Sequence, residues 1–237
     1  MLFNSIDFII FLPIVFVGYW YLNTKHLRLQ NIFLLIASYL FYGWWDYRFL
    51  VLIIFSTIVD YYVGKAIYNT EDRAKRKYFL WISLLANIGL LGFFKYYNFF
   101  LDNFITAFTF FGHQFGGSSL NIILPVGISF YTFQTLSYTI DIYRGNLKPT
   151  NDFIGFATFV SFFPQLVAGP IERASNLLPQ ILSERHFSFQ RGLDGIRLIL
   201  WGFFKKIVIA DNLAPSVDKI FNTLNPQAIN KKSQKSC

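Results

Sequence analysis

Long apolar runs limit what this chain can fold into. Seven runs are candidate membrane spans, near residues 6–22, 31–45, 49–64, 78–97, 121–140, 153–171 and 193–210. A helix needs about 20 apolar residues to cross a bilayer, with a working range of roughly 17–25, so several runs are at the short end. Flanking aromatic residues and long basic side chains extend a short span. The runs predict an all-α fold, a polytopic bundle of membrane helices.

The charge content agrees with a membrane protein. Charged residues make up 14% of the 237 residues, whereas a soluble domain carries about 25%. Net charge is +8, and the basic residues fall in short connections between apolar runs. No basic stripe follows an exposed face, so we expect no nucleic-acid partner and instead expect contacts with anionic lipid.

The connections differ in charge, and this difference predicts an orientation. Connections 23–30 and 65–77 are rich in Lys and Arg, which places them in the cytoplasm by the positive-inside rule. Connection 43–48 has no net charge, and the stretch 98–119 contains Asp102 but no Lys or Arg. Both are expected outside, so the N-terminus is predicted to lie outside as well.

Two apolar runs, 121–140 and 153–171, contain residues that interrupt helices. These are Pro125 and Gly127 in the first run, and Pro164, Gly169 and Pro170 in the second. Irregular backbone at membrane depth is tolerated only inside protein or beside a water-filled cavity. Each run is therefore either a broken or re-entrant helix, or a complete span that a proline kinks.

Few residues of the usual catalytic types lie inside the apolar runs. His26, His113 and His186 all fall in connections, where a solvated histidine is the expected state. The sequence has no nucleophile elbow, phosphate-binding loop or dinucleotide fingerprint. Its single cysteine, Cys237, and its histidines form no metal-ligand spacing, so we expect no metal site.

Polar residues inside the apolar runs are the candidates for a site. If segment 124–145 is helical, it carries a stripe of hydroxyl side chains, namely Ser129, Thr132, Thr135 and Thr139. Such a stripe either packs helices together or lines a polar cavity, and it is expected to face the bundle interior. Gln134 and Asp141 lie in the same segment, and Asp141 is expected to pair with Arg144 at the interface.

Segment 162–173 (FFPQLVAGPIER) holds the remaining candidates. Gln165 sits in an apolar run, so its amide needs partners inside the protein. Glu172 and Arg173 either pair at the interface or belong to a polar funnel for a substrate headgroup. The predicted substrate-path residues are Gln134, Asp141, Gln165, Glu172 and Arg173.

Seven blocks of this sequence resemble the membrane-bound O-acyltransferase superfamily, and within it the alginate O-acetyltransferase branch. The blocks are residues 2–5 (LFNS), 39–46 (YLFYGWWD), 60–64 (DYYVG), 94–98 (FKYYN), 124–145, 162–173 and 201–213. The resemblance runs to about Pro215. It predicts that residues 1–215 are the N-terminal portion of a family membrane domain and that 216–237 are a polar tail without family resemblance.

The resemblance implies a function. It implies transfer of an acyl group, usually acetyl, to a hydroxyl of an extracytoplasmic polysaccharide such as alginate. The acyl donor, acetyl-CoA or another carrier, is expected from the cytoplasmic side, with no cofactor bound. A periplasmic O-acetyltransferase partner protein and location in the bacterial inner membrane are also implied.

One departure from the family affects the catalytic residues. The family's catalytic histidine lies in its second half, in a Trp-His-Gly-like stretch that this sequence does not contain. The chain is therefore expected to be a truncated fragment that lacks the catalytic histidine region and is inactive alone. The alternative is a non-catalytic membrane component of polysaccharide transport or export.

Overall fold

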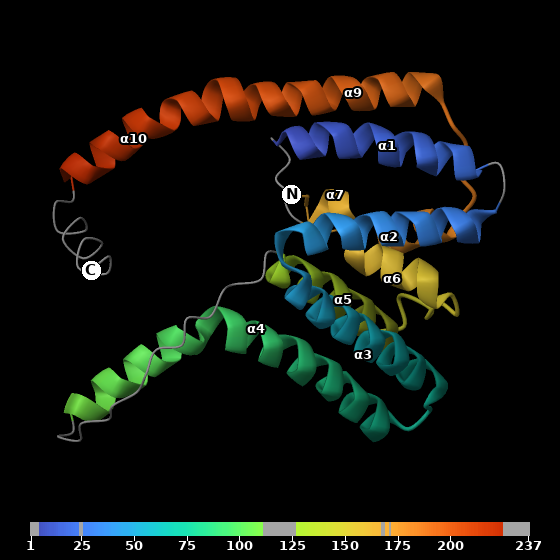
Figure 1. Ribbon diagram of the computed structural model, residues 1–237. Helices are drawn as coiled ribbons and strands as arrows, with labels where there is room; N and C mark the ends of the chain where they lie inside the picture. Colours follow the sequence, from blue (N-terminus) through green and yellow to red (C-terminus); the bar gives the residue numbers. More distant parts are fainter. Residues whose placement is uncertain (1–4, 24–25, 111–126, 167–168, 171, 225–237) are drawn as a thin grey trace. The chain divides into compact units, whose positions relative to one another are not determined.

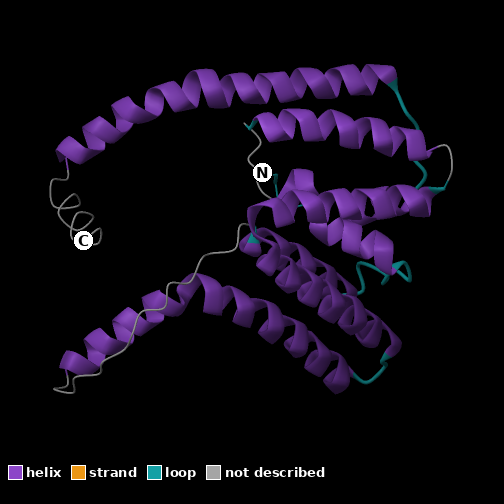
Figure 2. Cartoon of the chain, in the orientation of Figure 1, coloured by secondary structure: helices purple, strands orange, loops and turns teal. Residues whose placement is uncertain are grey.

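The computed structural model describes residues 5–23, 26–110, 127–166, 169–170 and 172–224. The ordered elements in these ranges are helices without any strand (Figure 2), which confirms the all-α prediction. They are α1 (Ile6–Asn23), α2 (Leu27–Asp46), α3 (Leu50–Asn69), α4 (Arg73–Phe110), α5 (Ile128–Tyr143), α6 (Phe153–Ser161), α7 (Phe163–Leu166), α8 (Ala174–Leu182), α9 (Phe189–Phe203) and α10 (Asp211–Leu224).

The chain divides into two compact units. The first, Met1–Arg185, contains α1 to α8 and all the predicted substrate-path residues. The second, His186–Cys237, contains α9 and α10. Helix α10 continues across residue 215, and the predicted boundary between a family domain and a tail stays a prediction.

The longest apolar helices match the third and fourth predicted spans. Tyr47–Asn69 and Arg73–Tyr97 are long and apolar enough to cross a membrane, judged by length and composition. Ile6–Leu22 and Phe153–Leu166 are apolar but shorter. An external connection was expected to begin after residue 97, but helix α4 continues past this point to Phe110.

The chain reverses direction between α2 and α3 in one short 3-10 turn, Tyr47–Phe49. The Asp46 carboxylate accepts from the Arg48 backbone N–H at 3.0 Å and pairs with the Arg48 guanidinium at 2.6 Å. This closes the turn, so the start of α2 and the end of α3 lie at the same end of the first unit (Figure 1). Asp46 and Arg48 lie at the opposite end.

We call the end where α2 starts and α3 and α5 finish the basic end. Arg76, in the first turn of α4, donates to the carbonyl of Tyr143 in the last turn of α5 at 2.8 Å. Lys65 lies in the last turns of α3 and donates to the Tyr61 hydroxyl at 2.8 Å. Basic side chains at the two ends of connection 65–77 therefore lie at this end.

Helices α6, α7 and α8 form a hairpin that enters and leaves at the basic end. In α6, Thr158 donates to the Asn31 carbonyl at 3.1 Å, and the Asn31 amide donates to the Ile181 carbonyl near the end of α8 at 3.0 Å. Helices α6 and α8 have nine residues each. At 1.5 Å per residue each spans about 14 Å, less than half of a hydrocarbon core of ~30 Å.

The hairpin confirms that run 153–171 is broken. Helix α6 ends at Phe162, whose ψ of 103° leaves the helical region. Pro164 follows in α7, where a proline lacks the N–H that a continuing helix requires. The Phe163 N–H instead donates to the Ser38 hydroxyl in α2 at 3.3 Å. The alternative of one kinked complete span is therefore wrong for this run.

Run 121–140 is described only in part. Helix α5 starts after Gly127 and continues to Tyr143, three residues beyond the predicted end. Pro125 and the first residues of the run lie outside the described residues, as does His113.

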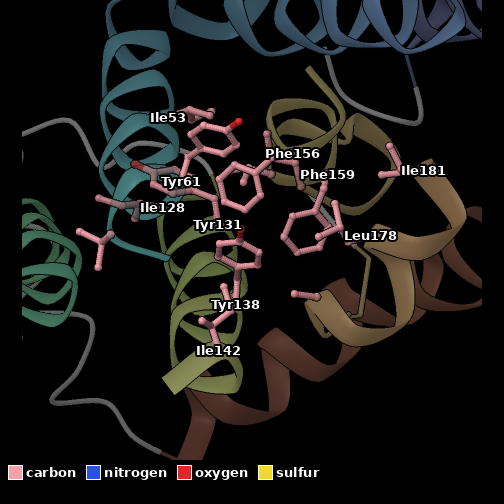
Figure 3. Packing of buried hydrophobic residues seen from close by; sticks show 14 of the residues in the cluster. Ile53, Tyr61, Ile128, Tyr131, Tyr138, Ile142, Phe156, Phe159, Leu178 and Ile181 are labelled. Atoms are coloured by element: carbon pink, nitrogen blue, oxygen red, sulfur yellow. The ribbon is translucent and has the colours of Figure 1, made fainter. Parts of the chain in front are cut away.

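Aromatic side chains fill the centre of the first unit (Figure 3). The Tyr138 ring in α5 lies 4.5 Å from the Phe156 ring in α6, and the Tyr61 ring in α3 lies 5.8 Å from Phe156. Lipid tails are as apolar as these rings, so in a bilayer the contacts stabilise the bundle by close packing and not by excluding water. Gly64 permits this packing, because a Cβ there would lie 2.7 Å from the Tyr138 ring.

The second unit is helical through residues 189–224, which covers the last predicted span, 193–210. A π-helical segment, Phe204–Ala210, joins α9 to α10. Lys206 pairs with Asp211, and the Lys205 ammonium lies 5.3 Å from the centre of the Trp201 ring. Lys205 and Lys206 therefore both have partners within this unit.

Candidate functional site

The tip of the hairpin, described at residues 162–166, 169–170 and 172–173, carries three predicted substrate-path residues. Gln165 lies in α7 with 6% of its surface exposed, so it faces the interior as expected. Its side-chain carbonyl, Oε1, has no hydrogen-bond partner among the described residues. Leaving such a buried group unpaired costs about 1–3 kcal/mol. In native proteins an atom of this kind requires an explanation such as an unplaced water, an ion or a functional role.

Gln134 makes a contact that the sequence did not predict, and its place on the substrate path stays a prediction. It is buried in α5, and its Nε2 donates to the backbone carbonyl of Phe159 in α6 at 2.6 Å. The last carbonyls of a helix have no partner within that helix. Gln134 satisfies one of them where α6 stops inside the bundle. It therefore anchors the hairpin through one of its two amide hydrogens.

The start of α5 packs closely against the end of α7. Gly127 has φ +78°, and a Cβ there would lie 2.7 Å from the Leu166 carbonyl oxygen, so only glycine suits this position. One turn later, the Tyr131 hydroxyl and the Thr132 hydroxyl are buried without partners among the described residues. Together with Gln165 Oε1, these atoms make the first turns of α5 and α7 the part of the bundle best able to receive polar groups of a ligand.

The other three predicted residues lie apart from this contact. The Asp141 side chain is 9% exposed in the last turn of α5, while Arg144 is exposed, and no ion pair joins them in the described structure. Glu172 accepts from the Asn176 amide at 2.6 Å and does not pair with Arg173. Arg173 is exposed and precedes α8. Among the described residues, the expected Asp141–Arg144 pair is therefore absent, as is a Glu172–Arg173 pair, which was one of two alternatives.

A buried polar cluster between α3, α4 and α5 was not among the predicted site residues. We call it the Asp60 cluster, and its members are Ser56, Asp60, Ser83, Asn87, Thr135 and Thr139. Two of them belong to the predicted hydroxyl stripe. Thr132, Thr135 and Thr139 are buried as expected, while Ser129 is half-buried.

Asp60 is the centre of this cluster and is fully buried. Its Oδ1 lies 2.5 Å from the Ser83 hydroxyl, and its Oδ2 accepts from the Asn87 amide at 2.8 Å. The Asn87 side-chain carbonyl in turn accepts from Ser56 at 2.6 Å and from Thr135 at 3.3 Å. The signal in the sequence was a single Asp in run 49–64, facing a Ser and an Asn four residues apart in run 78–97.

At the basic end, Arg185 joins α8 to the start of α2. Its two terminal nitrogens donate to the Gln30 side chain at 2.8 Å and to the Asn31 side chain at 2.7 Å. The guanidinium also lies 5.4 Å from the centre of the Tyr19 ring. Partial burial lowers the pKa of the Arg185 guanidinium. This arrangement fixes the α8 end of the hairpin to the start of α2.

The histidines that the structure describes are not part of the bundle interior. His26 and His186 are exposed. No group of three or more His, Cys, Asp or Glu side chains suited to a metal ion occurs in the described ranges. The buried polar side chains of the described residues are therefore amides, hydroxyls and the carboxyl groups of Asp60 and Asp141.

Curated proteins similar to this chain are bacterial O-acetyltransferases. It is 40% identical over 229 residues to a protein named probable alginate O-acetylase AlgI from Pseudomonas aeruginosa, covering 95% of this chain and 43% of that protein. To the protein of that name from Azotobacter vinelandii it is 38% identical over 228 residues, covering 95% and 45%. To a peptidoglycan O-acetyltransferase from Helicobacter pylori it is 36% identical over 247 residues, covering 92% and 46%.

The chain spans less than half the length of these relatives. The identity extends over nearly the whole chain and confirms the resemblance to the alginate O-acetyltransferase branch. No family model matches the chain, and no solved structure matches it.

Proposed function

Because this chain is homologous to bacterial O-acetyltransferases of the membrane-bound O-acyltransferase superfamily, we propose that it forms part of a multi-pass enzyme that transfers an acetyl group to a hydroxyl of an extracytoplasmic polysaccharide. Alginate is the first candidate, because most of the relatives are named for it. The re-entrant hairpin with the unpartnered Gln165 is the observation that carries the site assignment.

The hairpin suits the passage of a polar substrate through a membrane domain. A helix that stops at half depth exposes backbone groups, which is tolerated only inside protein or beside a water-filled path. Membrane transporters use such half-helix ends to bind polar groups of their substrates near the midplane. Here the tip carries Gln165 and Glu172, and α5 adds the Tyr131 and Thr132 hydroxyls on the neighbouring helix.

The distribution of basic residues supports an orientation. Lys65, Arg76 and Arg185 lie at the basic end, which we assign to the cytoplasmic side of the inner membrane. The N-terminus of α1 then lies outside. The acyl donor, acetyl-CoA or another carrier, arrives from the basic end. The polysaccharide and a periplasmic partner protein meet the enzyme at the opposite end.

Acetyl transfer needs a base, and no histidine lies inside the bundle among the described residues. A sugar hydroxyl attacks the acetyl carbonyl carbon while a base takes the hydroxyl proton. The bond between that carbon and the acyl carrier then breaks, and the carrier leaves with the electron pair. A positioned base contributes roughly 10²- to 10⁴-fold in rate. His26 and His186 are exposed, away from the hairpin tip. We therefore propose that the 237-residue chain alone is inactive and that hairpin residues orient substrate rather than exchange the proton.

The same observation favours a second candidate function. A membrane protein with amides and hydroxyls inside, and without a described histidine in its bundle, fits a non-catalytic component of polysaccharide export. That protein would bind the polymer or acyl carrier and transfer nothing.

Complementation distinguishes the two candidates. The chain would be expressed in an alginate-producing strain that lacks its own O-acetylase, alone and together with the remaining C-terminal part of the Pseudomonas relative, and alginate acetylation would be measured. We expect acetylation only with both parts. A Gln165→Leu variant should lose most of it, whereas Gln180→Leu, on the exposed face of α8, should keep it. Export of unacetylated polymer that depends on this chain, without acetylation in any combination, would favour the second function.

A further inference from the structure

We propose that the Asp60 cluster is a proton-binding site. Asp60 holds one proton as a neutral carboxylic acid and donates it to Ser83, so that α3, α4 and α5 pack around a shared proton. The proposal concerns a group outside the hairpin and is independent of the acetyl-transfer function.

Burial without a cationic partner is the first observation. Asp60 is fully buried in α3, nine residues from Asn69 at the basic end, which is about 14 Å along the helix. The ion pairs of the described residues lie elsewhere, at Arg48, Arg197 and Lys206. A charge taken out of water is costly unless a partner and several hydrogen bonds compensate it. A bound proton removes that charge.

Charged groups on the neighbouring elements are directed to other atoms. On α3, Lys65 donates to the Tyr61 hydroxyl and its ammonium lies 4.4 Å from the centre of the Tyr61 ring. On α4, Arg76 donates to the Tyr143 carbonyl. On α5, Asp141 is the nearest ionisable carboxyl along the helix, and before α6 the Asp152 carboxylate accepts from Ile154 N–H. None of these groups neutralises Asp60.

The hydrogen bonds of the cluster have a place for the proton. If Asp60 donates to Ser83 across the 2.5 Å contact, Ser83 donates to Thr139 at 3.1 Å, and Thr139 donates to the Leu136 carbonyl at 3.2 Å. Asp60 Oδ2 still accepts from Asn87. Every hydroxyl hydrogen in this chain of bonds then has an acceptor.

Asn87 argues against a metal cation at this position. Its Nδ2 donates both to Asp60 Oδ2 and to the Ser83 backbone carbonyl at 3.0 Å, and the second bond fixes which end of the amide faces the carboxyl group. The amide hydrogens therefore point at the position that a cation would occupy. Toward the basic end, Gly64 has no side chain, so the Tyr138 ring packs directly against α3.

Infrared spectroscopy of the full chain in lipid bilayers tests the proposal. The wild-type minus Asp60→Asn difference spectrum at pH 7 should contain the carbonyl stretch of a protonated carboxyl group, which disappears completely in the variant. The matched control is Asp194→Asn, an exposed residue that pairs with Arg197 at 3.1 Å, and its difference spectrum should show only carboxylate bands. Labelling all aspartates with carbon-13 should shift the carbonyl band without any substitution, which keeps the test valid if Asp60→Asn does not fold.

Ser83→Ala tests where the proton points. Loss of the acceptor should move the carbonyl band to higher frequency, as expected for a weaker hydrogen bond. The proposal is overturned if the wild type at pH 7 shows no isotope-sensitive carbonyl band of a protonated carboxyl group. It is equally overturned if sodium or potassium ions convert that band into carboxylate bands, because the site would then bind a metal cation.

Discussion

Replacing Gln134 with leucine tests whether a single amide anchors the re-entrant hairpin. Leucine is similar in size but cannot donate a hydrogen bond, so the Phe159 carbonyl loses its partner at 2.6 Å. Phe159 is fully buried, and α6 ends two residues later, so no other described donor is bonded to this carbonyl. The substitution therefore leaves a helix-end carbonyl unsatisfied inside the bundle.

The expected cost follows from the burial of both groups. A buried acceptor that loses its donor costs about 1–3 kcal/mol, which is roughly 5- to 150-fold in the unfolding equilibrium constant. Hydrogen bonds in membrane proteins average only ~0.6 kcal/mol when the unpaired groups find other partners. We expect a value in the higher range, because Phe159 has no exposed surface and cannot reach water.

Gln180→Leu is the matched control. Gln180 also donates from Nε2 to a backbone carbonyl, that of Asn176 at 3.0 Å, but on the exposed face of α8. Its replacement should change the free energy of unfolding by about 0.5 kcal/mol or less. Both variants would be unfolded by detergent titration and followed by tryptophan fluorescence. A Gln134→Leu effect no larger than that of Gln180→Leu would refute the anchoring role.

Three further predictions address packing, orientation and the basic end. Gly64→Ala should destabilise the bundle relative to Gly89→Ala, because the first Cβ meets the Tyr138 ring at 2.7 Å and the second meets nothing within 4 Å. Overpacking costs about 1–3 kcal/mol, whereas alanine at an open helix position gains roughly 0.5–1 kcal/mol. Thermal unfolding of both variants measures the difference. A cysteine placed at Asn69 should react with membrane-impermeant reagent only in opened cells, and one at Asp102 in intact cells; the reverse pattern contradicts the orientation. Arg185→Gln should lower stability by about 1.5–3 kcal/mol through lost bonds to α2, and an unchanged unfolding midpoint would show that these bonds contribute nothing.

The apolar runs predicted the first four helices because length and hydrophobicity suffice to define a span. Residues 6–22 and 31–45 became α1 and most of α2, and runs 49–64 and 78–97 lie within α3 and α4 or their flanking turn. Helix α8 was not predicted, since ASNLLPQIL mixes polar residues with a proline. Only Ala174, Leu178 and Ile181 are buried, on one face, and nine residues are too few for that period to stand out.

The candidate site was predicted less well, because residue type does not reveal the partner. Gln134 and Gln165 are both buried amides, yet one caps α6 and the other has an unpartnered carbonyl. The difference depends on where α6 stops, which no local pattern specifies. Asp60 was visible as a carboxyl group in an apolar run, but its partners Ser83 and Asn87 come from α4, 23 and 27 residues away along the chain.

The same argument explains why a hairpin of two short helices can persist inside this bundle. Neither α6 nor α8 is long enough to cross a bilayer, and isolated helices of nine residues are marginal even in favourable sequences. Their stability must come from bonds to longer helices, and these bonds are made by polar side chains at the break and at both ends. Asn31 and Ser38 on α2 hold one side of the hairpin, and Ser137 on α5 accepts from the Ala174 N–H at 3.3 Å on the other. Since side chains of α2 and α5 already bond these groups of the hairpin, Gln165 stays available as the polar group at the tip. Different residues therefore anchor the hairpin and carry its proposed function.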